Sequence, residues 1–318
     1  MSKPKSDSAN APIHITMGEP SGIGPEVAVA AYIALGGRVG TRALNLVGDP
    51  DVFRACGTVP DDALIATKAS AKRLPGILNV SSARAVIEAI ELSAGAAMSG
   101  EACAIVTAPI HKSVLTESGF AFPGHTEFLA HLTGAKHAVM MMASGKLKVV
   151  PLTIHIPLRE VPSRLSKEAI VETGEIVLAS LERDFAIAEP RLAVAGLNPH
   201  AGEAGTIGME EDTIICPAIE ELKAKGRRVT GPHSADTMFH DEARARYDAA
   251  LCMFHDQALI PSKTLAFWDG VNVTLGLPIV RTSPDHGTAL DIAGTGKADI
   301  RSMIAAIRRA AQMADARG

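Results

Sequence analysis

Short runs of apolar residues recur along the chain, and each run ends abruptly at a polar residue. The segments KVVPLTIH, RLAVAGLNPH and AALCMFHD show this pattern clearly. Unbroken apolar runs of this length are typical of strands that are buried on both faces of a sheet. The stretches between them carry apolar residues at helical spacing, as in residues 82–97, 166–183 and 210–225. Strands that alternate with helices predict an α/β fold with mostly parallel sheets.

The same pattern predicts the positions of single elements. Helices should begin near Glu26 and near Asp299, and Ser81 or Ser82 should cap the helix over residues 82–97. Pro151 lies inside the run KVVPLTIH, and proline cannot donate a hydrogen bond to a sheet, so this strand should be an edge strand or contain a bulge. We expect strands at residues 13–17, 43–47, 102–106 and 148–155, and one further strand over VNVTLGLPIV.

Length and charge limit the class of protein. With 318 residues, 47% of them hydrophobic, the chain can bury a large core and is long enough for two lobes. The formal net charge is -4, and the lysines and arginines are scattered along the sequence. Proteins that bind nucleic acid normally carry a concentrated basic surface. We therefore expect a protein that acts on small molecules and has no nucleic-acid partner.

The cysteines and the N-terminal segment indicate a compartment. Cys56, Cys103, Cys216 and Cys252 lie far apart and form no CxxC pair. They predict buried free thiols, which fits a reducing environment. The polar N-terminal residues lack the apolar core of a secretion signal, and no apolar run reaches the roughly 18 residues of a membrane span. The expectation is a cytoplasmic protein with no membrane partner.

Three predicted strands are followed by a histidine, namely His155, His200 and His255. The carboxyl ends of parallel strands lie on one edge of a sheet, where such side chains can converge. A single histidine in this position is more often a hydrogen-bonded structural residue, but recurrence at three equivalent positions favours a metal site. Three imidazoles with one open position suit Zn²⁺ or another divalent ion. Asp256 either orients His255 as a hydrogen-bond acceptor or caps the following loop.

Two cations and an amide follow the third histidine at regular intervals. Lys263, Asn272 and Arg281 lie in the predicted loops and in the strand VNVTLGLPIV, and together they suit a phosphate or a carboxylate. Taken singly, either charge is typical of an ordinary solvated surface residue. His125 and Thr126, in the turn FPGHTEF, add hydrogen-bonding groups that suit the polar parts of a substrate.

The segment GEPSGIGPEV joins the first predicted strand to the first helix. Gly22, Gly24 and Pro25 indicate a tight turn before that helix. The GxGxxG pattern of dinucleotide-binding proteins is absent, as is the acidic residue expected after a second strand. From the residues alone, a plain turn between a strand and a helix is the better interpretation.

Long motifs in this order resemble one enzyme family. GEPSGIGPEV, TAPIHK, PGHTEF, GLNPHAGE, ADTMFH, FHDQALIPSK and GVNVTLGLPIVRTSPDHGTALDIAG together resemble the 4-hydroxythreonine-4-phosphate dehydrogenases of pyridoxal phosphate biosynthesis. The likeness runs from Ile13 to the C-terminal helix. It implies a divalent metal (Zn, Mg or Co) at a homodimer interface, held by His155, His200 and His255. It implies substrate contacts from His125, Thr126, Lys263, Asn272 and Arg281.

A wider likeness connects the chain to the isocitrate and isopropylmalate dehydrogenases. GIGPEV and DHGTALDIAGTGKAD carry it. It implies a two-lobed fold with the active site in the interlobe cleft. It also implies NAD as cofactor, with NADP as the alternative, bound without a GxGxxG motif by His286, Gly287, Thr288, Asp291 and Gly294. We expect a disordered tail over residues 1–12, a cofactor lobe of residues 13–130 and 273–318, and a lobe for metal binding and dimerisation of residues 131–272.

The resemblance implies oxidation of 4-phosphohydroxy-L-threonine at C3, followed by decarboxylation to 3-amino-2-oxopropyl phosphate. The general base is not fixed by the sequence, and Asp236, Asp256 and Lys112 are the candidates. One alternative is a related dehydrogenase of threonate or erythronate 4-phosphate. Two alternatives from other classes are a zinc-dependent aldolase or hydrolase and a non-catalytic sensor of a phosphorylated ligand.

Overall fold

The computed structural model describes residues 10–318, and the chain divides into two compact units. Unit 1 contains residues 1–138 and 277–318, and unit 2 contains residues 139–276. Most of the tail expected over residues 1–12 lies outside the described residues. Of the remainder, Ala11 is buried and the carbonyl of Pro12 accepts a hydrogen bond from the Cys103 amide. Residues 11 and 12 are therefore packed against unit 1 ahead of the first strand.

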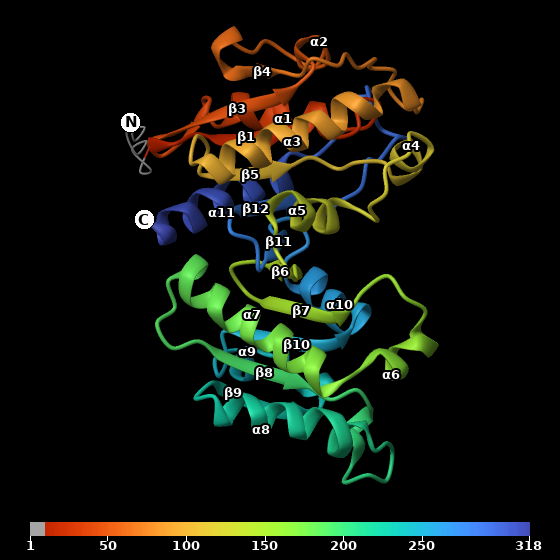
Figure 1. Ribbon diagram of the computed structural model, residues 1–318, viewed down its shortest axis with the longest axis vertical. Helices are drawn as coiled ribbons and strands as arrows, with labels where there is room; N and C mark the ends of the chain where they lie inside the picture. Colours follow the sequence, from red (N-terminus) through yellow and green to blue (C-terminus); the bar gives the residue numbers. More distant parts are fainter. Residues whose placement is uncertain (1–9) are drawn as a thin grey trace. The chain divides into compact units, whose positions relative to one another are not determined.

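Unit 1 is built around a mostly parallel sheet in the order β2-β3-β1-β5-β12, with β4 also paired to β3 (Figure 1). Only the short β2 runs antiparallel to its neighbour. The carboxyl ends of β1, β5 and β12 therefore lie on one edge. The strands are β1 (Ile13–Thr16), β2 (Arg38–Val39), β3 (Arg42–Gly48), β4 (Leu64–Ala66), β5 (Ala104–Thr107) and β12 (Val280–Pro284).

Helices cover the sheet of unit 1. One long helix packs against β1, β3 and β5, and the first and last helices of the chain pack against each other and against the sheet. The first helix starts directly after the glycine turn, with Pro25 in its first turn, as the sequence predicts. The helices are α1 (Gly24–Ala34), α2 (Pro50–Arg54), α3 (Ala83–Ser99), α4 (Lys112–Glu117), α5 (His125–Thr133) and α11 (Arg301–Arg317).

Unit 2 contains a mixed sheet in the order β11-β6-β7-β10-β8-β9. β11, β6 and β7 pair antiparallel, whereas β7, β10, β8 and β9 are parallel. The three strands that precede the candidate metal histidines are thus parallel neighbours. The strands are β6 (Val139–Ala143), β7 (Lys148–Thr153), β8 (Arg191–Ala195), β9 (Arg228–His233), β10 (Ala249–Phe254) and β11 (Val271–Leu275).

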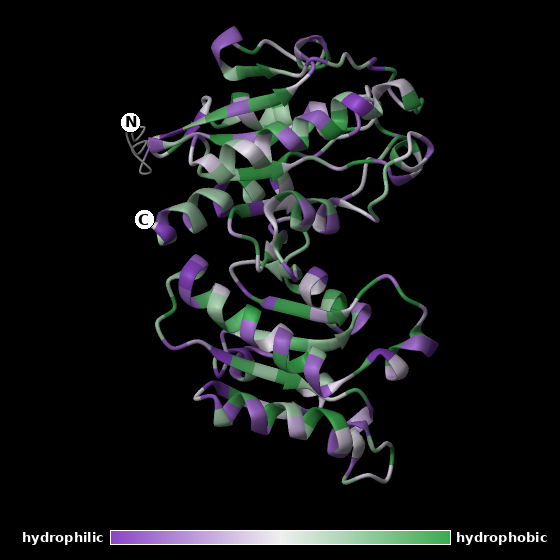
Figure 2. Ribbon diagram, viewed as in Figure 1, coloured by the Kyte–Doolittle hydropathy of each residue, from purple (hydrophilic) through white to green (hydrophobic). Residues whose placement is uncertain are grey.

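The helices of unit 2 pack against this sheet from both sides. α7 and α8 pack together and contact β6 to β9, and α10 packs on β7 and β10 (Figure 1). The strands of both units are mostly hydrophobic, whereas the helices combine apolar and polar residues (Figure 2). This is the distribution expected for helices that cover a buried sheet. The helices are α6 (Val161–Arg164), α7 (Lys167–Phe185), α8 (Cys216–Ala224), α9 (Asp241–Arg244) and α10 (His255–Leu265).

The structure shows neither the edge strand nor the bulge that was expected at Pro151. β7 is an interior strand between β6 and β10, and its register with β10 continues through Pro151 without a bulge. The ladder with β6, however, pairs only Lys148 and Val149. Pro151 therefore lies beyond that ladder, at a point where β7 has a paired neighbour on one side only, and its missing N–H breaks no bond there.

The segment VNVTLGLPIV is two strands, and not the single strand that the sequence indicates. β11 ends at Leu275, the chain turns at Gly276, whose φ is +82°, and β12 begins at Val280. Lys263 lies in α10, and not in a loop as expected. The helix was missed because Pro261 lies inside it, and proline normally breaks a helix.

Two smaller expectations also need correction. Ser82 precedes α3 but makes no capping hydrogen bond; instead the Asn79 side chain accepts one from the Ser81 amide. All four cysteines are free, but only Cys252 is fully buried.

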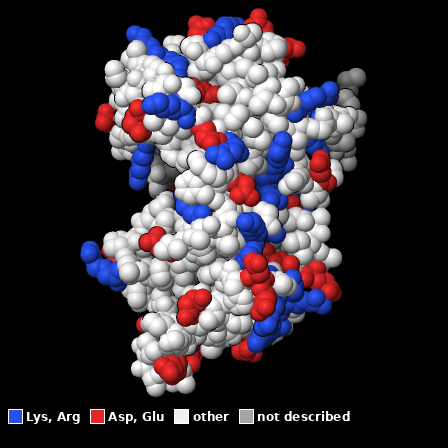
Figure 3. Space-filling model, turned by 180° about the vertical axis from the view of Figure 1, so that it is seen from behind, with Lys and Arg blue, Asp and Glu red and all other residues white. Residues whose placement is uncertain are grey.

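Charged side chains of both signs are intermingled on the face shown in Figure 3, in agreement with the scattered charges of the sequence. Within residues 10–318, no helix is both long and apolar enough to cross a membrane.

Ser166 provides a test of the local structure of unit 2. Its side-chain oxygen accepts a hydrogen bond from the Ala169 amide at 3.1 Å and so caps α7. Ser166→Ala should lower the free energy of unfolding by about 1 kcal/mol. The urea midpoint measures the effect, with Ser99→Ala as control, because Ser99 is exposed at the end of α3 and caps no amide. Equal midpoints for the two variants would contradict the assignment.

Candidate functional site

Side-chain hydrogen bonds join the carboxyl ends of β7, β10 and β8. The Thr153 hydroxyl donates to the Met253 carbonyl at 2.8 Å and links β7 to β10. The Gln257 amide nitrogen donates to the Gly196 carbonyl at 2.8 Å, while its oxygen accepts from the Met253 amide at 2.7 Å. Gln257 therefore links the end of β10 to the residue that follows β8. These bonds fix the three strand ends relative to one another.

His155 and His255 lie side by side beyond two of these strand ends. Their ring centroids are 5.9 Å apart, and both rings line an open pocket of about 260 Å³. His255 Nδ1 lies 2.7 Å from Asp256 Oδ1. Because a carboxylate only accepts hydrogen bonds, this contact places a proton on Nδ1 and leaves Nε2 of the neutral ring free to bind a metal. Asp256 therefore orients His255, one of the two roles that the sequence left open.

His200 lies in an exposed turn after β8. The buried carboxylate of Glu211 accepts hydrogen bonds from the amides of Leu197 and Asn198, at 2.7 and 2.8 Å, and so holds the start of this turn. His155 and His200 both have φ of +54°, in the left-handed region that few residues other than glycine adopt. Such strain is frequent at functional sites, because only the surrounding structure can maintain it.

The described part of a single chain does not assemble a complete metal site. Among residues 10–318, no group of three or more His, Cys, Asp or Glu side chains is arranged to hold a metal ion. The residues that are present fit such an ion in part. The imidazoles of His155 and His255 lie side by side, and the Asp256 carboxylate orients the His255 ring. Convergence of His200 on the same point stays a prediction.

In unit 1 a buried cation near the start of β12 reaches the carboxyl end of β5. Arg281 is 3% exposed, and its Nη2 and Nε donate to the Thr107 hydroxyl at 2.6 and 3.1 Å. Burial lowers the pKa of its guanidinium to about 10, so it stays charged at neutral pH. A buried positive charge that is hydrogen-bonded to a neutral hydroxyl favours binding of an anion.

His125, the first residue of α5, lies within the electrostatic influence of Arg281. Burial of the ring, and then the charge of Arg281, holds the pKa of His125 well below its usual value of 6.5. Its Nε2 is buried, and within residues 10–318 it has no hydrogen-bond partner. Buried polar atoms nearly always have a partner, so a bound ligand is the natural explanation. Thr126 follows it in the same helix.

The remaining substrate candidates lie in unit 2. Lys263 is half-buried on α10, and Asn272 is half-buried on β11. The side-chain oxygen of Asn272 is another buried atom that has no hydrogen-bond partner among the described residues. Their common role in binding one phosphate stays a prediction.

The cofactor candidates lie in the loop between β12 and α11. The Thr288 carbonyl accepts a hydrogen bond from the Ile23 amide at 2.9 Å, which joins this loop to the glycine turn. His286 Nε2 is buried without a partner in the described chain, while its Nδ1 lies 2.9 Å from the Gly287 carbonyl. Asp291 and Gly294 are exposed. The loop thus offers exposed and unpaired groups to a ligand.

The three candidates for the general base have different surroundings. Asp236 is exposed and accepts a hydrogen bond from the Ser234 hydroxyl at 2.6 Å. Lys112 is exposed at the start of α4. Asp256 contacts His255, and it alone of the three touches a candidate metal ligand in the described structure.

Two polar groups near the strand ends were not predicted from the sequence, the buried Glu19 and the half-buried Gln257. Glu19, in the turn after β1, is 1% exposed, and burial raises the pKa of its carboxyl although the Ser21 amide opposes the shift. Gln257 was missed because a glutamine after a strand has no distinctive pattern. Glu19 did carry a signal, since an acidic residue that follows a buried strand resembles Asp256 in position.

Comparisons with known proteins agree with the resemblance seen in the motifs. The family model described as "Pyridoxal phosphate biosynthetic protein PdxA" matches residues 44–310. A 4-hydroxythreonine-4-phosphate dehydrogenase of Paracoccus denitrificans is 51% identical over 95% of this chain and 98% of that protein. The enzyme of the same name from Xanthobacter autotrophicus is 47% identical over 97% and 95%.

Solved structures show the same likeness. The 4-hydroxythreonine-4-phosphate dehydrogenase of Klebsiella pneumoniae superimposes with a TM-score of 0.84 at 36% identity, over 96% of this chain and 100% of that one. A terephthalate 1,2-cis-dihydrodiol dehydrogenase from Burkholderia xenovorans gives 0.66 at 26% identity, over 95% and 98%. A β-decarboxylating dehydrogenase from Thermococcus kodakarensis, at 0.50 and 16%, over 92% and 81%, shares the fold alone. The predicted fold of the isocitrate and isopropylmalate dehydrogenase type is confirmed.

The low pKa of His125 predicts a pH-dependent stability. In the unfolded chain this residue takes up a proton near pH 6.5, whereas in the folded protein it stays neutral. The unfolded state then binds more protons, so stability should fall as the pH drops below about 6.5, by up to about 1.4 kcal/mol per pH unit. Urea midpoints between pH 7.5 and 5 should fall less for His125→Asn than for the wild type. His131→Asn, on the exposed side of the same helix, is the control, and its urea midpoint should change with pH as in the wild type. If the midpoint of His125→Asn also changed with pH as in the wild type, His125 would not be the source of the pH dependence.

Proposed function

Since the chain belongs to the family of the pyridoxal phosphate biosynthetic protein PdxA, a family of oxidoreductases, we propose that it oxidises 4-phosphohydroxy-L-threonine at C3 with NAD. Decarboxylation of the resulting β-keto acid then gives 3-amino-2-oxopropyl phosphate. The adjacent imidazoles of His155 and His255, at strand ends fixed by hydrogen bonds, are the observation that carries this proposal.

We propose that His155, His200 and His255 hold one divalent ion, Zn²⁺, Mg²⁺ or Co²⁺. When bound, such an ion supplies a Lewis acid for the substrate oxygen at C3. Asp256 holds the His255 ring in the orientation that presents Nε2. The proton of the C3 hydroxyl is taken up by a base within hydrogen-bond reach, for which Asp256, Asp236 and Lys112 remain the candidates.

A homodimer would supply the ligand that one chain does not bring into place. Two exposed apolar side chains lie close to the histidine pair: Leu158, 67% exposed, lines the same pocket, and Ile260, 64% exposed, lies on the helix that begins with His255. Large apolar side chains at such exposure support a protein interface here. We propose that a second copy of this chain covers them and completes the metal site.

The phosphate of the substrate is proposed to bind to Arg281, Lys263 and Asn272. Two observations support this assignment. The buried positive charge of Arg281 favours an anionic ligand, and the buried side-chain oxygen of Asn272 has no hydrogen-bond partner among the described residues, which a ligand would supply. His125 and Thr126 would contact other polar groups of the substrate. In its neutral form His125 both donates and accepts a hydrogen bond, which suits a hydroxyl or a carboxylate.

NAD, with NADP as the alternative, is proposed to bind to the loop that contains His286, Gly287, Thr288, Asp291 and Gly294. The unpaired Nε2 of His286 and the exposed backbone of the loop support the assignment. Nicotinamide supplies the hydride acceptor, and the loop supplies binding and orientation.

Oxidation of threonate or erythronate 4-phosphate is the second candidate. It is favoured by the Burkholderia xenovorans structure, whose name gives a dihydrodiol as substrate, because this shows that the fold serves dehydrogenases without an amino-acid substrate. The Xanthobacter autotrophicus and Klebsiella pneumoniae relatives are both named as dehydrogenases, which favours neither the aldolase nor the sensor alternative.

An assay of NADH formation distinguishes these functions. Chelator-treated protein should form no NADH from 4-phosphohydroxy-L-threonine. Added Zn²⁺, Mg²⁺ or Co²⁺ should restore the formation of NADH, measured by absorbance at 340 nm, and of CO₂, collected in a trap. A higher kcat/KM for threonate 4-phosphate would transfer the assignment to the sugar acid. Full activity after complete removal of metal would contradict the metal-dependent mechanism.

Arg281 tests the phosphate site separately. Arg281→Met should raise the KM for the phosphorylated substrate by about 10- to 100-fold, since charge-assisted hydrogen bonds contribute roughly 1.5–3 kcal/mol. Arg281→Lys keeps the charge and should lie between Arg281→Met and the wild type. Arg84→Met, at an exposed site on α3, is the control. An unchanged KM in a folded Arg281→Met variant would remove Arg281 from the site.

A further inference from the structure

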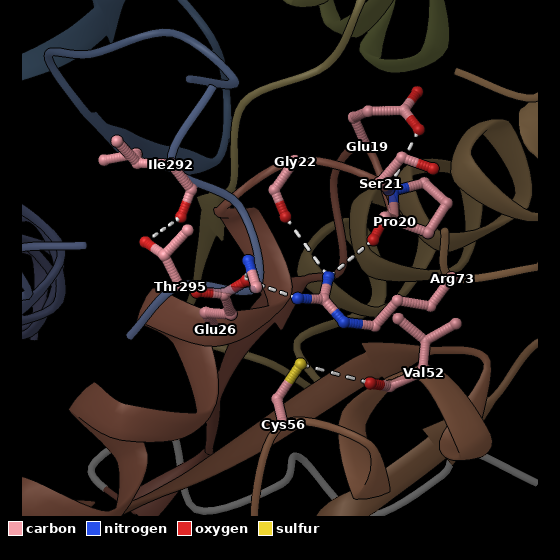
Figure 4. Close-up of polar contacts among 11 residues, drawn as sticks. Glu19, Pro20, Ser21, Gly22, Glu26, Val52, Cys56, Arg73, Ile292 and Thr295 are labelled. Carbon is pink, nitrogen blue, oxygen red and sulfur yellow. Dashed lines mark hydrogen bonds and ion pairs between the residues drawn. The ribbon is translucent and has the colours of Figure 1, made fainter. Parts of the chain in front are cut away.

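Three segments of unit 1 meet beside the start of α1. They are the glycine turn over residues 18–23, the stretch over residues 73–76, and the loop over residues 285–296 that contains the cofactor candidates. They are far apart in the sequence, and the stretch over residues 73–76 belongs to no helix or strand of the sheet. Figure 4 shows the contacts that Arg73 makes beside the glycine turn and with Glu26.

Backbone contacts pack these segments closely together. The Ile23 amide donates to the Thr288 carbonyl and the Gly76 amide donates to the Ser21 carbonyl, each at 2.9 Å. A Cβ on Gly22 would lie 2.7 Å from the Thr288 carbonyl oxygen, so only glycine fits at this contact. The position of the cofactor loop is therefore coupled to the other two segments.

One ion pair connects all three segments through side chains. The Arg73 guanidinium donates to the carbonyls of Pro20 and Gly22, at 2.6 and 3.2 Å, and forms an ion pair with Glu26 (Figure 4). The carboxylate oxygen of Glu26 that accepts from Arg73 also accepts from the Gly294 amide at 2.5 Å. The Arg73–Glu26 pair thus holds the backbone of the loop at a residue that belongs to the cofactor candidates.

The surroundings of the pair make it a strong constraint. The side chains of Arg73 and Glu26 are only 9% and 16% exposed, so water competes little for their hydrogen bonds. Gly294 has φ of +76°, and a Cβ there would lie 2.8 Å from the Pro75 ring. The loop is therefore held at Gly294 by the Glu26 carboxylate, which Arg73 fixes in turn, and by the close approach to Pro75.

We infer that Arg73 and Glu26 are positioning residues for the nicotinamide cofactor, which they serve by fixing the loop over residues 285–296 before the cofactor arrives. This inference rests on the proposed function, which places the cofactor at this loop. Ordering the loop in advance removes an entropic cost from binding, so the pair increases cofactor affinity without touching the cofactor. Glu26 belongs to the motif GEPSGIGPEV and Arg73 lies outside the quoted motifs, and the family resemblance gave neither residue a binding role.

A purely structural ion pair would behave differently. Its loss would lower stability and leave the affinity for the cofactor unchanged. Arg42 offers a matched control in the same unit. Its side chain is 4% exposed, and it binds Asp315 and the Ala11 carbonyl at the amino end of β3, which is the opposite edge of the sheet from the cofactor loop.

The experiment compares Arg73→Met, Arg73→Lys, Glu26→Gln and Arg42→Met with the wild-type protein. Calorimetric titration with NAD alone gives Kd, steady-state kinetics gives KM for NAD and kcat, and hydrogen exchange without NAD reports on the amides of residues 285–296. Arg73→Met and Glu26→Gln should raise Kd and KM for NAD about tenfold and speed exchange in the loop, with kcat at saturating NAD nearly unchanged. Arg73→Lys should show a smaller effect, and Arg42→Met should keep the wild-type Kd.

Unchanged Kd and unchanged loop exchange in both Arg73→Met and Glu26→Gln would overturn the inference, as would an equal loss of affinity in Arg42→Met. If the wild-type protein reduced no NAD with either substrate, the proposed function would fall. The exchange experiment needs no NAD and would still decide whether the Arg73–Glu26 pair holds the loop.

Discussion

The hydrogen bonds that join the ends of β7, β10 and β8 are the constraint on which the candidate metal site depends. Parallel pairing brings the carboxyl ends of the strands to one edge, but it does not fix the residues beyond them. Thr153 and Gln257 do so, because their side chains bind backbone groups of the neighbouring strand ends. The pairing of His155 with His255 is therefore a property of the sheet and not of a flexible loop.

In unit 1 the candidate substrate site depends on buried ionisable groups. The guanidinium of Arg281 reaches the carboxyl end of β5, and Glu19 lies in the turn after β1. Burial alters the pKa of each group in the direction that disfavours its charge. Buried charged and unpaired groups lower stability unless a partner satisfies them. The unpaired nitrogen of His125 belongs to the same pattern. Buried ionisable and unpaired polar groups of this kind are expected where a polar ligand completes the site, and they are frequent at functional sites.

The sequence predicted those features that depend on local pattern. The strand that ends before His255 follows from its apolar run, and the helix over about residues 166–183 was predicted between two such runs. The expected cap of the helix that begins at Ala83 was wrong, since Ser82 makes no capping hydrogen bond. Features that depend on tertiary contacts were not predictable. The turn at Gly276 divides the mostly apolar segment VNVTLGLPIV, and Pro261 is accommodated inside α10. Arg73 and Glu26 lie 47 residues apart, so no spacing rule could have paired them.

X-ray absorption at the zinc edge tests the central claim, that the three strand-end histidines bind one metal ion. The sample is protein stripped by chelator and reloaded with one equivalent of Zn²⁺ per chain. The account predicts three imidazole nitrogens at about 2.0–2.1 Å from zinc in the wild type, and a lower number in His200→Gln. A coordination shell without histidine, or one that His200→Gln leaves unchanged, would contradict it.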